Sequence, residues 1–214
     1  GAVLEPAYAP PAWFIGKLII GTNEWTPALD ICDKCSSEMH EKKRAFDRQV
    51  EIERHINTAN IPKRFKDAEI ESMNRENFLI LKEHIEPYTT RQSNLYIHGL
   101  TGAGKTWAAS AVLKGFIRQT SLEGYFESVP GLCDVLRGAH KGNQSELLTE
   151  QYASYPALVL DDLGVERPTE YVVERLYIII NKWYENMKTG LIITSNKMLD
   201  DIAKRLDDRI TSRI

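Results

Sequence analysis

The chain has 214 residues, of which 43% are hydrophobic and 27% charged, which is enough for one α/β core and a modest accessory region. Its net charge of −3 excludes a globally basic nucleic-acid coat, so any DNA contact must come from a local patch of Lys and Arg. The sequence has no apolar run of about 18 residues, and its three cysteines are too few for a disulfide framework. We therefore expect a soluble, cytoplasmic protein with no membrane partner.

The first 60 residues are expected to form an N-terminal region apart from the rest of the chain. Residues 1–31 hold four of the nine prolines and show no sustained period, which predicts irregular structure. Residues 36–60 are rich in charge and in good helix formers, which predicts a solvated helical linker. Pro62 ends that helix, because proline disfavours helical geometry in the residue before it. An amphipathic helix is expected at 78–88, within a second domain at 61–214.

Two cysteines in the N-terminal region have the spacing of half a zinc site. Cys32 and Cys35 are separated by two residues, but no upstream Cys or His completes the set. His40 and, more remotely, His55 are the candidates for the remaining ligands. A degenerate Zn²⁺ module and a pair of free thiols therefore stay open as alternatives.

From Leu95 onward, short apolar runs alternate with longer helical stretches. This pattern predicts βαβ units, and hence an α/β fold with a parallel central sheet flanked by helices. The predicted strands are 95–98, 125–129, 157–161 and 191–194. The predicted helices are 105–118, 132–138, 145–153, 170–188 and 200–213.

A phosphate-binding loop follows the first of these strands. Gly99-x4-Gly104-Lys105-Thr106 lies between an apolar strand and a helix, which is the setting that this motif requires. Its glycines let successive N–H groups face the phosphates, aided by the positive end of the helix dipole. Lys105 is expected to reach the β- and γ-phosphates of ATP, and Thr106 to offer a hydroxyl to Mg²⁺. The predicted nucleotide-binding residues are Gly99, Thr101, Gly102, Ala103, Gly104, Lys105, Thr106 and Asp161.

The strand at 157–161 ends in two carboxylates, which a buried strand rarely does unless the charges have a task. Asp161 is expected to hold Mg²⁺ together with Thr106, and Asp162 to polarise the water that attacks the γ-phosphate. The alternative is that Asp162 only starts a turn.

Two further groups of polar residues are candidates for catalysis. Asn196, after the strand at 191–194, is expected to orient water or contact the γ-phosphate, unless it only caps the next helix. Arg209 and Arg213 stand four residues apart and so share one helix face. They are either surface charges or groups that neutralise transition-state charge in a neighbouring subunit.

Together these motifs resemble the AAA+ helicase loaders DnaC and DnaI and the similar transposition helper ATPase IstB. The similarity covers about 61–214, and its motifs lie at 61–65, 99–106, 159–164, 194–196 and 208–213. It implies a P-loop NTPase (AAA+) fold, with Asn196 as sensor 1 and Arg213, rather than Arg209, as the finger that acts on an adjacent protomer. Because the family continues past the arginine motif, the resemblance also implies that 61–214 lacks a C-terminal strand and lid.

The resemblance further implies an ATPase that loads a replicative helicase onto single-stranded DNA during replication. Such a protein would form a homo-oligomer with ATP at the subunit interfaces. Three alternatives stay open: an IstB-like helper that binds duplex DNA and a transposase, a small-molecule kinase, and a nucleotide-dependent binding module that hydrolyses ATP poorly. The candidate DNA contacts, with solvated surface charge as their alternative, are Lys114, Arg118, Arg137 and Lys141.

Overall fold

The computed structural model describes residues 16–18, 25–27, 33–73, 94–141, 144–164, 169–186, 190–206 and 208–214. The chain divides into two compact units, Gly1–Glu51 and Ile52–Ile214. Within the described ranges, no helix is long and apolar enough to cross a membrane. The amphipathic helix predicted at 78–88 lies outside them.

The N-terminal part of the chain contains a short hairpin and a long helix. Strands β1 (Gly16–Leu18) and β2 (Trp25–Pro27) pair antiparallel, so the expectation of irregular structure is wrong for these two segments. Strands of three residues are too short for an alternating pattern to stand out in the sequence. Helix α1 (Asp33–Thr58) confirms the helix predicted at 36–60.

Four parallel strands form the central sheet of the second unit. They are β3 (Leu95–His98), β4 (Gly124–Ser128), β5 (Ala157–Asp161) and β6 (Leu191–Ser195), in the order β3-β6-β5-β4. Each pairing is parallel, which confirms the predicted sheet, and each strand lies within one residue of its predicted bounds. Because β6 inserts between β3 and β5, the ends of these three strands are neighbours.

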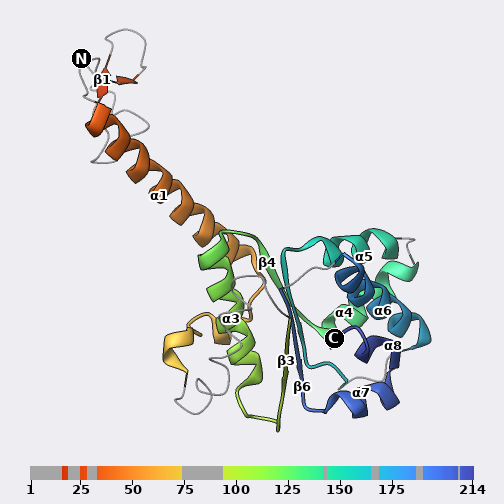
Figure 1. Ribbon diagram of the computed structural model, residues 1–214. Coiled ribbons are helices and arrows are strands. Elements are labelled where there is room, and N and C mark those ends of the chain that lie inside the picture. The colour runs from red at the N-terminus through yellow and green to blue at the C-terminus, as the bar shows by residue number, and fades with distance from the viewer. Residues whose placement is uncertain are drawn as a thin grey trace, which may run out of the picture. The chain divides into compact units, whose positions relative to one another are not determined.

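Helices cover both faces of this sheet (Figure 1). Helix α3 (Lys105–Thr120) packs on one face, where Ala157 and Val159 point, while Leu158 and Leu160 point to the other face. All of β5 is buried, which is why it reads as a continuous apolar run. The helices of the other face are α4 (Val129–Lys141), α5 (Ser145–Ser154), α6 (Glu170–Glu185), α7 (Leu199–Arg205) and α8 (Asp208–Thr211).

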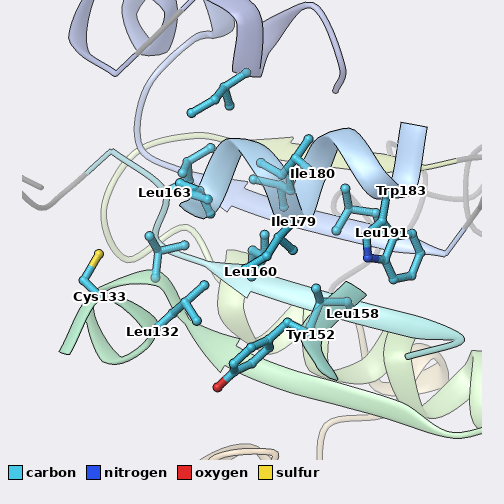
Figure 2. Close-up of a cluster of buried hydrophobic side chains, with 14 of the residues drawn as sticks. Leu132, Cys133, Tyr152, Leu158, Leu160, Leu163, Ile179, Ile180, Trp183 and Leu191 are labelled. Atoms are coloured by element: carbon cyan, nitrogen blue, oxygen red, sulfur yellow. The ribbon is translucent and has the colours of Figure 1, made fainter. Parts of the chain in front are cut away.

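The hydrophobic cluster of the second face lies between the sheet and α6. Figure 2 shows Ile179 and Trp183 of α6 against Leu158, Leu160 and Leu191 of the strands. Each of these side chains is at most 1% exposed. Burying a side chain of this size stabilises the fold by about 1.5–3 kcal/mol. The packing therefore holds β5 and β6 side by side, so that their carboxyl ends keep a constant spacing.

Helix α4 begins at Val129 rather than at the predicted Leu132. The hydroxyl of Ser128 accepts the N–H of Gly131 at 3.1 Å, which caps the helix at its first residue. Pro130 lies in the first turn, where a missing N–H costs nothing. The prediction that a strand extends through Val129 is therefore wrong.

The prediction of a single helix at 200–213 is also wrong. The chain forms two short helices, α7 and α8, and Leu206 ends α7 with φ −107° and ψ −73°. Helix α8 packs against α6, so a tertiary contact sets its direction in place of local helix propensity. As a result Arg209 lies on α8, whereas Arg213 follows its end.

A pair of glycine substitutions tests the backbone of the sheet. Gly190 precedes β6 with a φ of +110°, and a Cβ there would lie 2.8 Å from the carbonyl oxygen of Pro156. Gly190→Ala should lower the free energy of unfolding by about 2–3 kcal/mol, because alanine is strained at that φ. Gly138→Ala is the matched control, since its Cβ would meet nothing within 4 Å in α4. It should raise stability by about 0.5–1 kcal/mol in urea titrations; a similar effect of both changes would contradict this account.

Candidate nucleotide-binding site

The carboxyl ends of β3, β5 and β6 meet at one edge of the sheet, the usual place for a ligand in parallel α/β folds. Two backbone hydrogen bonds tie the loops that follow. The N–H of Gly99 donates to the carbonyl of Ser195 at 3.2 Å, and the N–H of Leu163 donates to the carbonyl of Thr194 at 2.8 Å. The three motifs predicted from the sequence are thus brought together.

The loop between β3 and α3 curls around the side chain of Lys105. Gly102 and Gly104 adopt φ values of +84° and +86°, which other residues rarely adopt. Lys105 Nζ donates to the carbonyl oxygens of Gly99 and the next residue, at 3.0 Å each. The loop tip, 101–104, is exposed, whereas Lys105 is 9% exposed. The loop therefore presents its backbone outward with a buried cation beneath it, an arrangement suited to phosphate.

Two hydroxyl groups hold the buried carboxylate of Asp161. Thr106 Oγ1 donates to one carboxylate oxygen at 3.1 Å, and Thr194 Oγ1 donates to the other at 2.6 Å. Burial raises the pKa of Asp161 above its usual value, against the opposing effect of the hydrogen bond from Thr194. A carboxylate facing a threonine hydroxyl beside the phosphate loop is a donor set that fits Mg²⁺, which prefers oxygen ligands. The structure thus brings together Thr106 and Asp161, whose role as Mg²⁺ ligands stays a prediction.

Asp162 turns the chain at the end of β5. Its φ of +62° lies in the left-handed region, where Asp and Asn are enriched among residues other than glycine. Its N–H donates to Thr194 Oγ1 at 2.9 Å, so one hydroxyl group serves both carboxylate residues. Thr194 was not among the predicted site residues. The signal for it was a pair of polar residues, Thr194 and Ser195, at the end of an apolar strand that is buried throughout.

A cavity of about 390 Å³ joins the phosphate loop to residues from three other segments. The predicted site residues Asp162 and Asn196 both line it, but three planar side chains that also line it were missed: Arg64, Phe65 and Trp107. The guanidinium of Arg64 stacks 4.9 Å from the centroid of Phe65. Planar groups beside a phosphate loop are suited to stack on a base. Its full lining is Arg64, Phe65, Thr101, Gly102, Gly104, Lys105, Thr106, Trp107, Asp162 and Asn196.

The two C-terminal arginines lie against α6 rather than among the described residues that line this cavity. Arg209 stacks on the ring of Tyr177, 4.8 Å from its centroid, and Arg213 on the ring of Tyr184, at 4.5 Å. Arg213 Nε also donates to Asn181 Oδ1 at 3.0 Å. The arginines therefore still share one side of the molecule, although α8 ends between them.

Comparison with known proteins agrees with this geometry. The IstB-like ATP binding protein family matches residues 36–213. The chain belongs to this family. The match is to an ATP-binding domain and includes the phosphate loop, which we therefore call the ATP-binding loop. The resemblance noted from the sequence is thereby confirmed.

Curated relatives of this IstB-like chain match only part of their own length. The uncharacterized protein YqaM of Bacillus subtilis is 31% identical over 132 residues, which is 58% of this chain and 40% of YqaM. The replication initiator DnaA of Neisseria meningitidis is 27% identical over 120 residues, or 55% of this chain and 23% of DnaA. The chain thus spans less than half the length of these relatives.

Solved structures show the same fold. The DnaC helicase loader aligns with a TM-score of 0.63 and 27% identity, covering 71% of this chain and 94% of that one. DnaI aligns with a TM-score of 0.63 at 22% identity, covering 72% and 90%. DnaA bound to AMPPCP and single-stranded DNA aligns at 0.60 and 20% identity, covering 72% and 48%. The predicted P-loop fold of the AAA+ type is therefore confirmed.

The zinc prediction stays a prediction. Cys32 and the side chain of Cys35 lie outside the described residues, although Cys35 falls on α1. In the part of the chain that the structure describes, no group of three or more His, Cys, Asp or Glu side chains could hold a metal ion.

One of the candidate DNA contacts is wrong. Lys114 is 3% exposed, and its ammonium bonds to three oxygens of the protein, so it cannot reach DNA. Arg118 pairs with Glu69, and Arg137 pairs with its neighbour on α4, Asp134. The side chain of the fourth candidate, Lys141, lies outside the described residues.

The bridging role of Thr194 can be measured directly. Thr194→Val removes the hydroxyl at nearly constant volume and leaves a buried carboxylate oxygen and the N–H of Asp162 without this partner. The free energy of unfolding should fall by about 1–3 kcal/mol. Thr194→Ser, which keeps the hydroxyl, should recover more than half of the loss in the same denaturant titration. A valine variant as stable as the wild type would show that the bridge contributes nothing.

Proposed function

We propose that the protein is a magnesium-dependent ATPase. The observation that carries the proposal is the pair of hydrogen bonds from Thr106 and Thr194 to Asp161, which joins the ATP-binding loop to the two strand ends. A site that only bound phosphate would have no need of a buried carboxylate, whose desolvation is costly. The same carboxylate, with Thr106, suits a site for Mg²⁺.

The residues of the cavity would divide the chemistry among them. Lys105 would exchange its two carbonyl partners for the β- and γ-phosphates, while the N–H groups of the loop bind the remaining oxygens. Thr106 and Asp161 would hold Mg²⁺, which would supply charge neutralisation for the phosphates. Asp162 would polarise the attacking water, and Asn196 would orient that water or contact the γ-phosphate.

We further propose that the arginines complete the site of a neighbouring subunit. Arg209 and Arg213 lie against α6 with their guanidinium planes on tyrosine rings. Stacking fixes the plane of a guanidinium, which orients it for binding a phosphate. In a homo-oligomer with ATP at its interfaces, Arg213 would act as the finger that stabilises the transition state.

For the cellular role, we favour an ATP-dependent helicase loader that acts in the cytoplasm during DNA replication. Its partners would be a replicative helicase and single-stranded DNA. The support is the DnaC helicase loader, which aligns over 94% of its own length at 27% identity.

A second candidate is an IstB-like transposition helper, which would bind duplex DNA and a transposase. The observation in its favour is the family match over residues 36–213, the longest stretch that any of these comparisons covers. The two candidates share the ATPase site and differ in the DNA and protein that they engage.

Two variants test both the ATPase activity and the proposed binding to a replicative helicase. Asp162→Asn should bind ATP but lose at least about 100-fold in kcat, because an amide cannot accept a proton from water. Lys105→Ala should bind no ATP, since it removes the charge opposite the phosphates. With a ring-shaped replicative helicase, the wild type should co-purify in ATP, Asp162→Asn should stay bound, and Lys105→Ala should not bind.

Full turnover by Asp162→Asn would place the base elsewhere. ATP-dependent filaments on duplex DNA, with no retention of helicase, would replace the loader by the transposition helper.

Mixing two inactive variants tests the arginine in trans. Arg213→Ala should spare ATP binding and reduce turnover on the order of 10³-fold where subunits assemble. Lys105→Ala should be inactive for a different reason, because its own loop is defective. A mixture pairs an intact loop with an intact arginine at some interfaces, so activity should partly return. No recovery in a mixture whose subunits demonstrably co-assemble, or full activity of Arg213→Ala alone, would reject the assignment.

A further inference from the structure

One short segment supplies two of the planar side chains that line the nucleotide cavity, Arg64 and Phe65, which we call the planar wall. It begins at Pro62, continues through the 3-10 turn η1 (Lys63–Phe65) and ends at Glu69. Arg64 and Phe65 of this segment line the cavity together with the ATP-binding loop. The loop leads directly into α3, whereas the segment lies about 40 residues upstream in the sequence. Something must therefore fix the segment to α3 for the wall to stand at a constant distance from the phosphates.

A buried lysine of α3 makes that connection. Lys114 Nζ donates to the carbonyl oxygens of Lys66 and Ala68, at 2.7 and 2.8 Å, and to Glu69 Oε1 at 2.5 Å. An ammonium group has three N–H donors, so the segment occupies all of them. Lys114 is only 3% exposed. Burying its charge costs free energy, and an apolar side chain at this position would not have that cost. The charge thus serves to bind these particular oxygens.

The carboxylate of Glu69 completes the connection. It accepts from Arg118, one turn beyond Lys114 on α3, as well as from Lys114 itself. The hydrogen bond from Arg118 is the main reason why the pKa of Glu69 falls to about 2. Glu69 therefore stays ionised and paired throughout the neutral pH range.

A cavity of about 410 Å³ lies beside this connection. It is lined by the end of α1, by Pro62, Lys63 and Lys66 of the segment, and by Lys114 itself. Phe65 and Ala68 of the segment pack against the hydrophobic cluster to which α3 contributes. The bonds from Lys114 and to Glu69 therefore act together with this packing to hold the segment against α3.

The geometry of α3 places the lysine in line with the cavity. Trp107, which lines the cavity, and Lys114 are seven residues apart, which is close to two full turns and hence the same helix face. The helix starts at Lys105, directly after the ATP-binding loop. A single rigid helix therefore carries the phosphate-binding residues at one end and the anchor of the planar wall further along.

We propose that Lys114 is a positioning residue for the nucleoside part of ATP. By fixing Arg64 and Phe65 relative to α3, it sets the fit of the base and sugar and leaves phosphate binding and the hydrolytic step unchanged. The proposal rests on the proposed function, because it assumes that ATP occupies this cavity.

Calorimetry with two ligands isolates this role. Mg-ATP contains the nucleoside, and Mg-tripolyphosphate is the probe without it. In Lys114→Met, which is similar in length but uncharged, the Kd for ATP should rise about tenfold, or about 1.4 kcal/mol, while the Kd for tripolyphosphate stays within about twofold. Steady-state kinetics should show the same split, with KM raised about tenfold and kcat within about twofold. Lys182→Met, which removes an exposed partner of Glu150, is the control and should change neither constant.

Glu69→Gln provides a second measurement that does not depend on the folding of the methionine variant. It keeps both carbonyl bonds to Lys114 and weakens the third, so it should shift the ATP-to-tripolyphosphate ratio in the same direction by a smaller factor. An unchanged ratio in both variants, or equal losses for both ligands, would overturn the positioning role. If the wild type binds and hydrolyses ATP but the ratio is unchanged in both variants, this inference fails alone; if the wild type does not bind ATP, the proposed function fails with it.

Discussion

The arrangement of the site depends on a buried carboxylate that two hydroxyl groups satisfy. Asp161 ends β5, Thr194 comes from the neighbouring strand β6, and Thr106 comes from the first turn of α3. A charge at 5% exposure is tolerated only if its oxygens are bonded, so all three elements must keep their places together. The strand order makes this feasible, because β6 lies between β3, which leads into α3, and β5. The ATP-binding loop is thereby tied to the strand ends that carry Asp162 and Asn196.

The centre of the sheet was predictable because β5 and β6 are buried along their whole length. Such strands read as short apolar runs, and the predicted and observed bounds of β5 coincide. The helices were predictable in their order along the core but not at their ends, and the last predicted helix divides into α7 and α8. The early start of α4 depends on the hydroxyl of Ser128, and the break at Leu206 accompanies the packing of α8 on α6, a contact between segments distant in the sequence. Spacing alone placed Arg209 and Arg213 on one helix, which the structure corrects.

The site divides in the same way into local and distant parts. The phosphate loop and the two carboxylates follow directly on apolar strands, so sequence order alone locates them. The planar wall could not be located, since Arg64 and Phe65 meet the loop only through tertiary structure. Lys114 was misread for the same reason: its carbonyl partners stand 48 and 46 residues upstream, and a lysine in a helix is usually exposed. The motif at 194–196 was noted in the sequence, but the role of Thr194 depends on its bonds to Asp161 and Asp162, which lie more than 30 residues away.

The two faces of the sheet carry different parts of the proposed ATPase machinery. The face covered by α3 contains what a subunit needs to bind its own nucleotide: the loop, the wall and the lysine that joins them. The other face, covered by α4 to α8, contains the arginines proposed to act on a neighbour. Between them, β5 and β6 are buried along their whole length. Asp162 and Asn196 directly follow these strands and line the cavity, and α7 begins shortly after Asn196. In the proposed ATPase, loss of the γ-phosphate would first change the surroundings of Asp162 and Asn196, and Asn196 precedes the segment that carries the arginines.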